Sequence, residues 1–414
     1  MVNSVTAVDQ VLVVGGGIGG LATAYALAQT GLQVRVMERA AEFAEIGAGL
    51  QLAPNATRLL RRFGLLGDVL TTSVRPRRLV ARNAVSGEEL TWLDLAATAE
   101  RYGAPYIVLH RSDLLNVLLA RCRAESRIEL ETSKRVVRTT DHGDVVEVAC
   151  ADGTIYQATA VVGADGLNSV VRPLVVQDQP ICSGYVAYRG AVPLDTIRGR
   201  PPLEDVIVWF GPGMHLVQYP VRSATLYNQV AVFRSDAFAA GAQDWGTPEE
   251  LDARFSVCAG PVREALPALR RDRRWPMYDR IPSGTWSKGR VVLIGDAAHP
   301  MLQYLAQGAC QAMEDAAALA GALEKTATTP HLAAGDLEVA FGEYQAARVE
   351  QAGRVQRAAR TWGDIWHVDG LAMALRDEAF RLRPLNDYRH VDWLYAGDQL
   401  TQEYGTDLAS TSAN

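Results

Sequence analysis

The chain has 414 residues, 48% of them hydrophobic and 21% charged, with a formal net charge of −6. This length allows two or three domains, and the negative charge argues against a nucleic-acid-binding protein. Its five cysteines have no CxxC spacing, which excludes a zinc ribbon and a dithiol redox pair, and we expect no metal site. The first residues lack the pattern of a signal peptide, and no apolar run reaches the roughly 18 residues of a membrane span. We therefore expect a cytoplasmic protein.

The predicted elements alternate between helices and strands. The chain opens as a βαβ unit, with strands at 11–14 and 34–38 around a helix that ends near Gln29. Hydrophobic periodicity predicts further helices over 56–70, from an N-cap at Ser112 to about Arg123, from about Gln311 to Leu323, and over 338–366. Alternating apolar residues predict strands within 128–165, a separate sheet at 185–191, 206–210, 214–219 and 227–233, and a buried strand at 291–294.

A glycine-rich turn follows the first strand and reads GGGIGG over 15–20, which matches GxGxxG. Gly15 permits the tight turn, Gly17 lets the backbone approach a pyrophosphate at the helix N-terminus, and Gly20 allows close packing of helix on strand. Glu38 closes the second strand about 20 residues later, where a carboxylate accepts from a ribose hydroxyl. The motif predicts a dinucleotide site without choosing between NAD and FAD.

Three later segments make that choice. Residues 162–172 (VGADGLNSVVR) and 293–300 (LIGDAAHP) resemble the two further FAD signatures of group A flavin-dependent aromatic hydroxylases. Residues 106–114 match the segment that brings an arginine to the cofactor, and 47–55 (GAGLQLAPN) match the loop along the flavin. The chain is identified as a member of that family, which has no separate NAD(P)H domain. The resemblance implies FAD binding by Gly15, Gly17, Ile18, Gly20, Glu38, Arg39, Gln51, Arg111, Asp165, Gly166, Asp296, Gly308 and Ala309.

The family implies an α/β fold like that of p-hydroxybenzoate hydroxylase. In it, a Rossmann-like FAD-binding domain is interleaved with a mixed β-sheet substrate domain, and C-terminal helices follow. The corresponding boundaries here are 8–75, 100–180 and 283–325 for the FAD-binding domain, 76–99 and 181–282 for the substrate domain, 326–400 for the helices and 401–414 for a flexible tail.

On the substrate side, His215, Val217 and Tyr219 share one face of a predicted strand, because side chains alternate with period two. In the family, a phenol that has lost, or partly lost, its hydroxyl proton attacks the electrophilic distal oxygen of a C4a-hydroperoxyflavin. A histidine with a pKa near 6.5 can take that proton at neutral pH. The alternative is a histidine that only packs in the core or lies on the surface.

A second candidate departs from the family pattern. Gln303 stands where the family has a proline, and Ala306 where it has a glycine. A glutamine there could hold a phenol oxygen beside the reacting centre. The alternative is a tolerated substitution in a turn.

These features together resemble the 3-hydroxybenzoate 6-hydroxylases within the family. The resemblance implies catalytic roles for His215, Gln303 and Tyr219 and substrate contacts from Tyr106, Tyr188 and Arg189. It also implies hydroxylation of 3-hydroxybenzoate para to its hydroxyl, giving gentisate with NADH (or NADPH) and O2. Arg189 is left open between the substrate carboxylate, the flavin and bracing of the sheet, and we interpret His367 and His390 as structural.

Two other functions stay open. One is hydroxylation of a different phenol, either a salicylate or a biosynthetic intermediate, since such enzymes share all the flavin motifs. The other is a flavoprotein oxidase or sensor that does not hydroxylate. We expect a small phenolic acid as partner and no nucleic acid or membrane span. The long C-terminal helix permits a homodimer.

Overall fold

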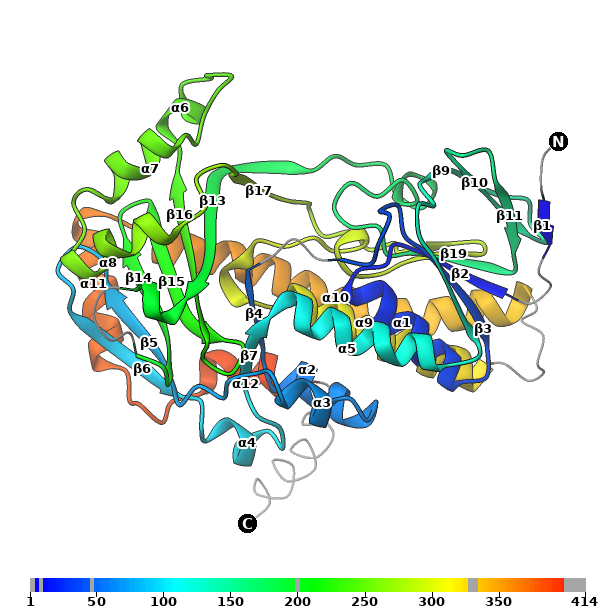
Figure 1. Cartoon of the computed structure of the whole chain (residues 1–414), viewed down its shortest axis with the longest axis horizontal. Helices are drawn as coiled ribbons and strands as arrows, with labels where there is room; N and C mark the ends of the chain where they lie inside the picture. Colours follow the sequence, from blue (N-terminus) through cyan, green and yellow to red (C-terminus); the bar gives the residue numbers. More distant parts are fainter. Residues whose placement is uncertain (1–3, 7–9, 45–47, 198–201, 327–333, 398–414) are drawn as a thin grey trace, which may run out of the picture. The chain divides into compact units, whose positions relative to one another are not determined.

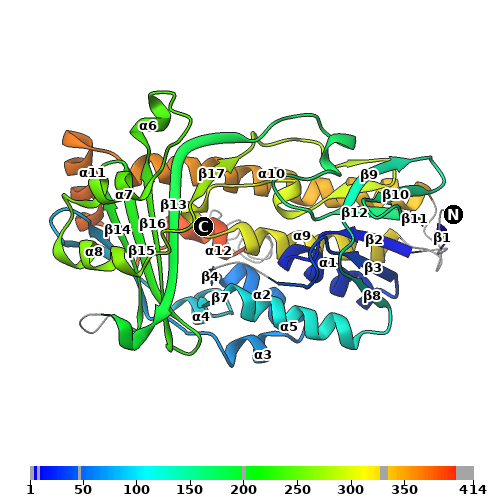
Figure 2. The ribbon, with the colours of Figure 1, turned by 45° about the horizontal axis from the view of Figure 1, so that its top comes forward.

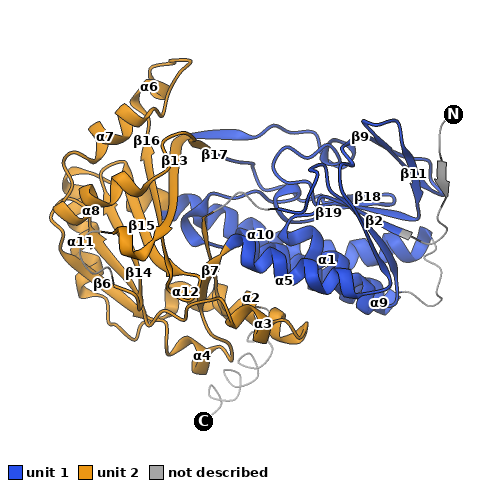
Figure 3. Ribbon diagram, in the orientation of Figure 1, with its two compact units in different colours: residues 1–47, 111–183, 277–362 blue, residues 48–110, 184–276, 363–414 orange. Residues whose placement is uncertain are grey.

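The computed structural model describes residues 4–6, 10–44, 48–197, 202–326 and 334–397. Two compact units emerge from its contacts, each built from three chain segments (Figure 3). Unit 1 comprises residues 1–47, 111–183 and 277–362, and unit 2 comprises 48–110, 184–276 and 363–414. The predicted tail at 401–414 lies outside the described residues.

The main sheet of unit 1 is the one that the βαβ pattern predicts. Its strand order is β18 (Ser287–Lys288), β19 (Val291–Leu293), β12 (Ala160–Gly163), β2 (Gln10–Val14), β3 (Gln33–Met37) and β8 (Ile128–Glu131). All neighbours pair in parallel except β18 and β19. Val11, Leu12 and Val13 of β2 are buried, as expected for a parallel strand that is covered on both faces.

Helices and a smaller sheet complete unit 1. The helix α1 (Ile18–Gln29) joins β2 to β3 and packs against α5 (Arg111–Ala124) and α9 (Gly308–Thr326) (Figure 1). The long helix α10 spans Ala334–Trp366. A four-stranded sheet has the order β1 (Ser4–Thr6), β11 (Ile155–Ala158), β10 (Val146–Cys150) and β9 (Val136–Asp141).

Unit 2 is organised around a seven-stranded mixed sheet, of which β14, β15 and β16 can be followed side by side in Figure 2. The order is β17 (Trp275–Asp279), β13 (Ile181–Pro193), β16 (Leu226–Arg234), β15 (Met214–Val221), β14 (Asp205–Gly211), β5 (Arg78–Asn83) and β6 (Glu89–Asp94). β14 pairs with β5 in parallel, whereas β13, β16, β15 and β14 pair in antiparallel fashion. One face packs its apolar side chains against α7 (Pro248–Phe255) and α8 (Gly260–Ala265).

The rest of unit 2 consists of a pair of antiparallel strands that are distant in the sequence, together with short helices. β4 (Gly49–Leu52) pairs with β7 (Ile107–His110) in antiparallel fashion. The helices are α2 (Pro54–Arg62), α3 (Leu66–Leu70), α4 (Thr98–Arg101), α6 (Asp236–Ala239), α11 (Gly370–Leu382) and α12 (Arg389–Tyr395). Among the described residues, no helix has both the length and the apolar character that crossing a membrane requires.

The predicted fold class is confirmed, whereas several element and domain boundaries differ from the predictions, as in the following cases. The helix predicted over 56–70 is broken into α2 and α3, because Gly64 has a positive φ of 70° that ends the first helix. α5 begins at Arg111, so Ser112 lies inside the helix and is not its N-cap. Residues 48–75 and 100–110 belong by their contacts to unit 2, whereas the predicted domains put them with the FAD-binding segments.

Candidate functional site

The glycine turn of unit 1 has backbone positions that no side chain can occupy. Gly15 has φ 111°, and a Cβ built on it would lie 2.4 Å from the carbonyl oxygen of Ala164. A Cβ on Gly20 would lie 1.9 Å from the carbonyl oxygen of Gly15. Gly17 is extended and directly precedes α1, whose first residue, Ile18, is buried. The turn therefore presents bare backbone at a helix N-terminus, which is the form that binds a pyrophosphate.

Glu38 is tied to this turn. Its carboxylate accepts from the Gly16 N–H at 2.9 Å through Oε2 and from the Ala40 N–H at 2.8 Å through Oε1. Each carboxylate oxygen has a second lone pair that could accept from a ribose hydroxyl. The adjacent Arg39 is exposed. The ribose contact of Glu38 stays a prediction, but the side chain lies beside the glycine turn as that role requires.

Asp165 supplies a test of whether the site fits a ligand. Its Oδ2 accepts from the N–H groups of Val170 at 2.7 Å and Val171 at 3.3 Å. Its Oδ1 is shielded from solvent and has no hydrogen-bond partner among the described residues. Burial raises the pKa of this carboxyl. Because a buried polar atom without a partner is costly, Oδ1 fits a donor from a bound group such as a flavin nucleotide. The next residue, Gly166, has φ 79°.

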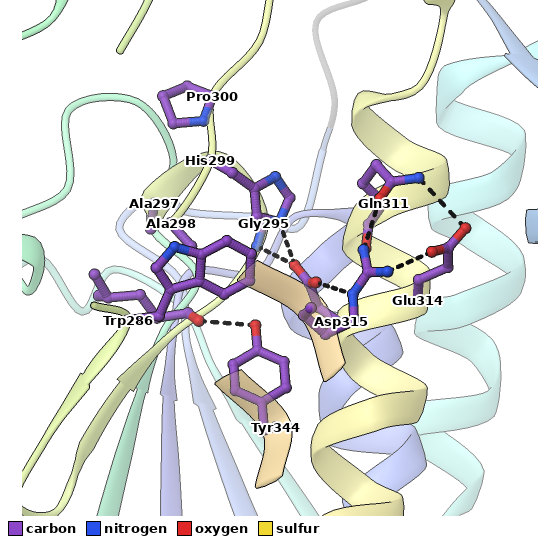
Figure 4. Close-up of polar contacts among 12 residues, drawn as sticks. Trp286, Gly295, Ala297, Ala298, His299, Pro300, Gln311, Glu314, Asp315 and Tyr344 are labelled. Atoms are coloured by element: carbon purple, nitrogen blue, oxygen red, sulfur yellow. Dashed lines mark hydrogen bonds and ion pairs between the residues drawn. The ribbon is translucent and has the colours of Figure 1, made fainter. Parts of the chain in front are cut away.

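A buried charged cluster holds the loop that carries Asp296. Asp315 of α9 accepts from the Gly295 N–H at 2.8 Å and from Nε2 of His299 at 2.5 Å, and Arg348 Nε donates to it at 2.9 Å (Figure 4). Burial alone would raise the pKa of Asp315, but His299 and Arg348 lower it to about 2. This anchor leaves Asp296 exposed.

Asp296 lies beside the start of α9. A Cβ built on Gly308 would be 3.9 Å from Oδ1 of Asp296. Gly308 and Ala309 form the first turn of α9, whose free N–H groups favour an anionic or polar ligand group. Arg111 begins α5 and is half-buried. The predicted cofactor contacts of unit 1 thus cluster at strand ends and helix starts.

Sequence reasoning missed the residue that connects the two later FAD signatures. Arg172 is fully buried and donates through Nη1 to the carbonyl oxygens of Ala297 and Ala298, both at 2.7 Å. Its Nε and Nη2 bind the carboxylate of Asp178, each at 2.7 Å. Arg172 is the last residue of the segment 162–172. Its place at the end of that motif was the sequence feature that could have indicated its role.

Gln303 begins a short 3₁₀ turn, Gln303–Leu305, and is half-buried. Ala306 ends that turn with φ 53° and ψ 36°, the left-handed conformation that glycine adopts without strain. The departure from the family pattern at Ala306 is therefore a strained alanine at a position suited to glycine. The predicted phenol contact of Gln303 stays a prediction.

In unit 2, strand register determines which candidate residues share a face. His215 pairs with Val232, which pairs with Ala187; Val217 pairs with Val230, which pairs with Arg189. Directly paired residues point to the same side of a sheet. We call this side the His215 face, made of Ala187, Arg189, His215, Val217, Tyr219, Val230 and Val232. Arg189 thus shares a face with His215 and Tyr219.

Tyr188 lies on the opposite face, because it is adjacent to Arg189 in the strand. It is fully buried in the apolar core with Phe233, and its hydroxyl donates to the Gly246 carbonyl oxygen at 2.7 Å. The prediction grouped Tyr188 and Arg189 as substrate contacts, but alternation of side chains separates them. We correct this by leaving Tyr188 out of the proposed substrate site.

His215 is fully buried and contacts a second histidine. Its Nδ1 lies 2.8 Å from Nε2 of His367, and the two rings are inclined by 21°. Burial, and then the charge that a protonated His367 would carry, lower the pKa of His215 well below its ordinary value. Burial, and then Arg376, lower the pKa of His367 to about 3. Both rings are therefore neutral at pH 7. The sequence interpretation of His367 as structural missed this contact, since 152 residues separate the two histidines.

The other end of the His215 face carries tyrosines and amides. The Tyr106 hydroxyl donates to Oε1 of Gln51 at 2.6 Å. Burial raises the pKa of Tyr219, and Arg189 and a hydrogen bond with Gln51 oppose that rise. Gly49 donates through its N–H to Oδ1 of Asn228 at 2.6 Å. Tyr106, Gln51 and Tyr219 therefore form one polar cluster. Their predicted roles stay predictions.

Comparison with known proteins identifies the family of the chain. A family model described as an FAD binding domain matches residues 9–331. The chain belongs to this family. It is 36% identical over 387 residues to a 3-hydroxybenzoate 6-hydroxylase of Polaromonas naphthalenivorans strain CJ2, with 93% of this chain and 95% of the relative covered.

Two other similar proteins bear on substrate and fold. A 3-amino-4-hydroxybenzoate 2-monooxygenase of Streptomyces cremeus is 36% identical, covering 93% of this chain and 94% of the relative. The crystal structure of Klebsiella pneumoniae HpxO complexed with FAD and uric acid superposes with a TM-score of 0.80 at 27% identity, covering 94% and 97% of the two chains. The chain is thus an FAD-dependent aromatic monooxygenase.

Proposed function

We propose that this monooxygenase hydroxylates 3-hydroxybenzoate para to its hydroxyl group, giving gentisate, with NADH and O2 as co-substrates. NADPH is the alternative reductant. The observation that carries the proposal is the His215 face, on which a buried neutral imidazole, an apolar floor and a guanidinium occur together. A hydroxybenzoate needs each of these: a base for its phenol, a surface for its ring and a cation for its carboxylate.

The register sets the scale of this face. His215 and Tyr219 are four residues apart on β15, so their Cα atoms are separated by about 13 Å at roughly 3.3 Å per residue. Arg189 lies two strands away from Val217 and one row beyond His215, which puts its Cα about 12 Å from that of His215.

His215 is suited to accept the phenol proton. Because its pKa lies well below 6.5, the ring is unprotonated at neutral pH and can act as a base. Removing the phenol proton pushes electron density into the ring, most strongly at the ortho and para carbons. Bound FAD, once reduced, supplies the electrophilic oxygen by reaction with O2.

Arg189 is suited to bind the carboxylate. A guanidinium donates two parallel hydrogen bonds to a carboxylate, which fixes both position and orientation. The Arg189 guanidinium lies over the Trp275 ring, with Cζ 5.7 Å from the ring centroid, so stacking supports it from one side. We therefore propose that Arg189 binds the substrate carboxylate. The sequence alone had left this role open beside a contact with flavin and bracing of the sheet.

A second substrate deserves testing, because the aminohydroxybenzoate monooxygenase is as similar to this chain as the hydroxybenzoate enzyme is. Its substrate also carries a carboxylate and a phenol, so the His215 face accommodates both. The 4-hydroxyl of that substrate is para to the carboxylate, whereas the hydroxyl of 3-hydroxybenzoate is meta to it. The two substrates therefore differ in the angle between base and cation.

The test is a panel of phenolic acids assayed with the FAD-bound enzyme for NADH and NADPH oxidation, O2 consumption and product identity. The panel contains 3-hydroxybenzoate, 3-amino-4-hydroxybenzoate, salicylate and unsubstituted phenol. We expect 3-hydroxybenzoate to stimulate NADH oxidation and yield gentisate in stoichiometric amount. Hydroxylation of the amino compound alone would replace the proposal with the second substrate, and hydrogen peroxide without hydroxylated product from any phenol would return the chain to the oxidase function.

Gln303 has its own test in the same assay. Replacing Gln303 with proline restores the family's residue and removes the side-chain amide. If Gln303 holds the phenol oxygen, Gln303→Pro shifts the coupling of NADH oxidation to hydroxylation or the carbon that is attacked. Unchanged product and coupling would make Gln303 a tolerated turn substitution.

A further inference from the structure

The last residue of α12, Tyr395, contacts the polar cluster of Gln51, Tyr106 and Tyr219. Its ring meets the Tyr106 ring with centroids 5.9 Å apart and planes inclined by 55°, and both side chains are buried. The Tyr106 hydroxyl donates to Oε1 of Gln51 at 2.6 Å, and Gln51 is also hydrogen-bonded to Tyr219 of the His215 face. Tyr395 is thus linked to the His215 face through the ring of Tyr106.

The end of α12 is held by an arginine of α2. Arg58 donates through Nη1 to the carbonyl oxygen of Tyr395 at 3.0 Å and through Nη2 to that of Ala396 at 2.5 Å. The same Nη1 donates to the carbonyl oxygen of Tyr102 at 3.0 Å. The last carbonyl groups of a helix have no partner within it, so a guanidinium at this end satisfies them and is attracted by them. The backbone of Tyr395 is therefore fixed relative to α2, which lies beside α12 (Figure 1).

The start of α12 is held by an ion pair. Asp392 accepts from Arg101 Nε at 2.8 Å and Nη2 at 2.9 Å, and from the Tyr102 hydroxyl at 2.7 Å. The Tyr102 ring also meets the Tyr395 ring edge-on, with centroids 5.7 Å apart, which is a favourable arrangement of two aromatic rings. The Tyr395 ring therefore contacts the rings of both Tyr102 and Tyr106, on a helix that is held at both ends.

These contacts restrict where the Tyr106 ring can lie. A buried ring that is truncated leaves a cavity into which its neighbours relax in part. Without the Tyr395 ring, Tyr106 can tilt into that cavity, which lengthens the hydrogen bond between its hydroxyl and Gln51. Gln51 then loses the orientation that links it to Tyr219. Side chains in a binding site keep their geometry when packing and hydrogen bonds behind them lock their rotamers.

We propose that Tyr395 is a positioning residue that holds the Tyr106 ring in place for the substrate, so that the C-terminal helix α12 takes part in shaping the substrate site. This inference rests on the proposed function in taking Tyr106 as a substrate contact. Because the ring of Tyr395 makes the contact with Tyr106, a phenylalanine should serve in its place.

Tyr219 gives a readout of this role that needs no substrate. The FAD-bound enzyme is labelled with 3-fluorotyrosine, and the 19F signal of Tyr219 is assigned with Tyr219→Phe. Tyr219 is linked to Tyr395 through Gln51 and Tyr106, so a change in its signal reports a displaced Tyr106. We expect Tyr395→Leu to shift or broaden this signal and Tyr395→Phe to leave it unchanged. An unchanged Tyr219 signal in Tyr395→Leu would overturn the proposal, whichever phenol is the substrate.

Substrate binding gives a second readout. Tyr395→Leu should weaken binding of 3-hydroxybenzoate by about 10-fold or more, because a small displacement of a group in the site is costly. Tyr395→Phe should bind it as tightly as the unaltered enzyme does. Titration followed by flavin absorbance measures the dissociation constants, and the FAD content of the purified proteins should be equal. If Tyr395→Phe bound the acid as weakly as Tyr395→Leu, the ring contact would not be the cause and the proposal would fail.

Tyr388→Leu separates positioning from support of the fold. Tyr388 directly precedes α12, is buried, and meets the Tyr102 ring edge-on with centroids 6.3 Å apart. Its hydroxyl donates to the carbonyl oxygen of Asp94 at 2.9 Å. Tyr388→Leu should therefore lower the Tm, as Tyr395→Leu does, but should leave the Tyr219 signal and the affinity for 3-hydroxybenzoate unchanged.

The two leucine variants decide between the roles. An equal loss of affinity in both would mean that α12 supports the fold without positioning Tyr106, and would overturn the proposal. If the Tyr219 signal responds as expected but the unaltered enzyme hydroxylates no phenol, the proposed function fails and the positioning of Tyr106 by Tyr395 stands.

Discussion

Arg189 and His215 share one face of the seven-stranded sheet, although they are 26 positions apart in the sequence and β16 lies between their strands. Arg189 is paired with Val230 and through it with Val217, one row beyond His215. Between the two polar side chains the face is apolar, because Val230 and Val232 of the intervening strand β16 point to it. A cation and a neutral base at the edges of an apolar floor define a polarised site, with one end for an anion and the other for a proton donor.

Arg189→Gln should weaken binding of 3-hydroxybenzoate by about 10-fold to 100-fold, the value of a hydrogen bond to a charged group. The neutral analogue 3-hydroxybenzamide should bind the variant and the unaltered enzyme almost equally, because it has no carboxylate to lose. Titration followed by flavin absorbance measures both dissociation constants. Arg273→Gln is the control, since Arg273 also stacks on Trp275, at 5.2 Å, but is exposed. Equal affinity of Arg189→Gln for the acid would show that the carboxylate is bound elsewhere.

His215→Ala should separate the two half-reactions. Flavin reduction by NADH does not need a base for the phenol, so its rate should stay within a few fold. Hydroxylation should slow by roughly 100-fold or more, the usual contribution of a general base, and hydrogen peroxide should replace product. Stopped-flow absorbance and product quantification measure the two steps. Coupling at the level of the unaltered enzyme would remove His215 from the mechanism.

Sequence reasoning worked best where geometry is local. The glycine turn and the strand alternation of His215 and Tyr219 follow from short-range backbone rules, and the structure has each in the expected element. Glu38 was predicted to close its strand, but β3 ends one residue earlier, at Met37. The same alternation, applied to the neighbours Tyr188 and Arg189, would have separated them without any structure.

Long-range contacts were beyond reach. His367 directly follows α10 and contacts His215 within unit 2, and no periodicity links residues so far apart in the sequence. Arg172 was visible as the last residue of a motif, but its carbonyl partners at Ala297 and Ala298 depend on how two loops fold together. The domain boundaries also depend on long-range contacts. The β4–β7 pair lies in unit 2, whereas the motifs alone assigned both of its strands to the FAD-binding domain.

Glu38→Ala should weaken FAD binding by about 10-fold or more, because it removes the acceptor of the Gly16 and Ala40 N–H groups as well as any ribose contact. Glu38→Gln keeps one acceptor oxygen, so its affinity for FAD should lie between that of the unaltered enzyme and that of Glu38→Ala. Flavin content after purification and titration of the FAD-free protein give the measurement. Glu42→Ala, an exposed carboxylate four residues later, is the control. Full flavin retention by Glu38→Ala would count against the role of this carboxylate.

Ala306→Gly should stabilise the protein. Ala306 has φ 53°, and an L-residue in that conformation costs about 1 kcal/mol relative to glycine. Relief of that strain should raise the Tm by about 2 °C, measured by differential scanning calorimetry of the FAD-bound enzyme. Ala318→Gly makes the same chemical change inside α9, where it should lower the Tm, because glycine is the poorer helix former. A lower Tm for Ala306→Gly would mean that its methyl group packs usefully despite the strain.

Asp315 should make the stability of unit 1 depend on pH. Its folded-state pKa of about 2 lies below the ordinary 3.8, so protonation favours unfolding. The stabilisation, on the order of 2 kcal/mol, is therefore present above about pH 4 and is lost as the pH falls towards 2. Asp315→Asn removes the negative partner of buried Arg348 and should lower the free energy of unfolding at pH 7 by about 3 kcal/mol. Urea unfolding of both proteins across pH 3 to 7 should show the difference in the free energy of unfolding shrinking below pH 4.

Asp144→Asn, in an exposed loop, is the control, and its free energy of unfolding should equal that of the unaltered protein at each pH. A difference that stays constant with pH would mean that the loss at Asp315 comes from altered packing and hydrogen bonding, without a contribution from its charge.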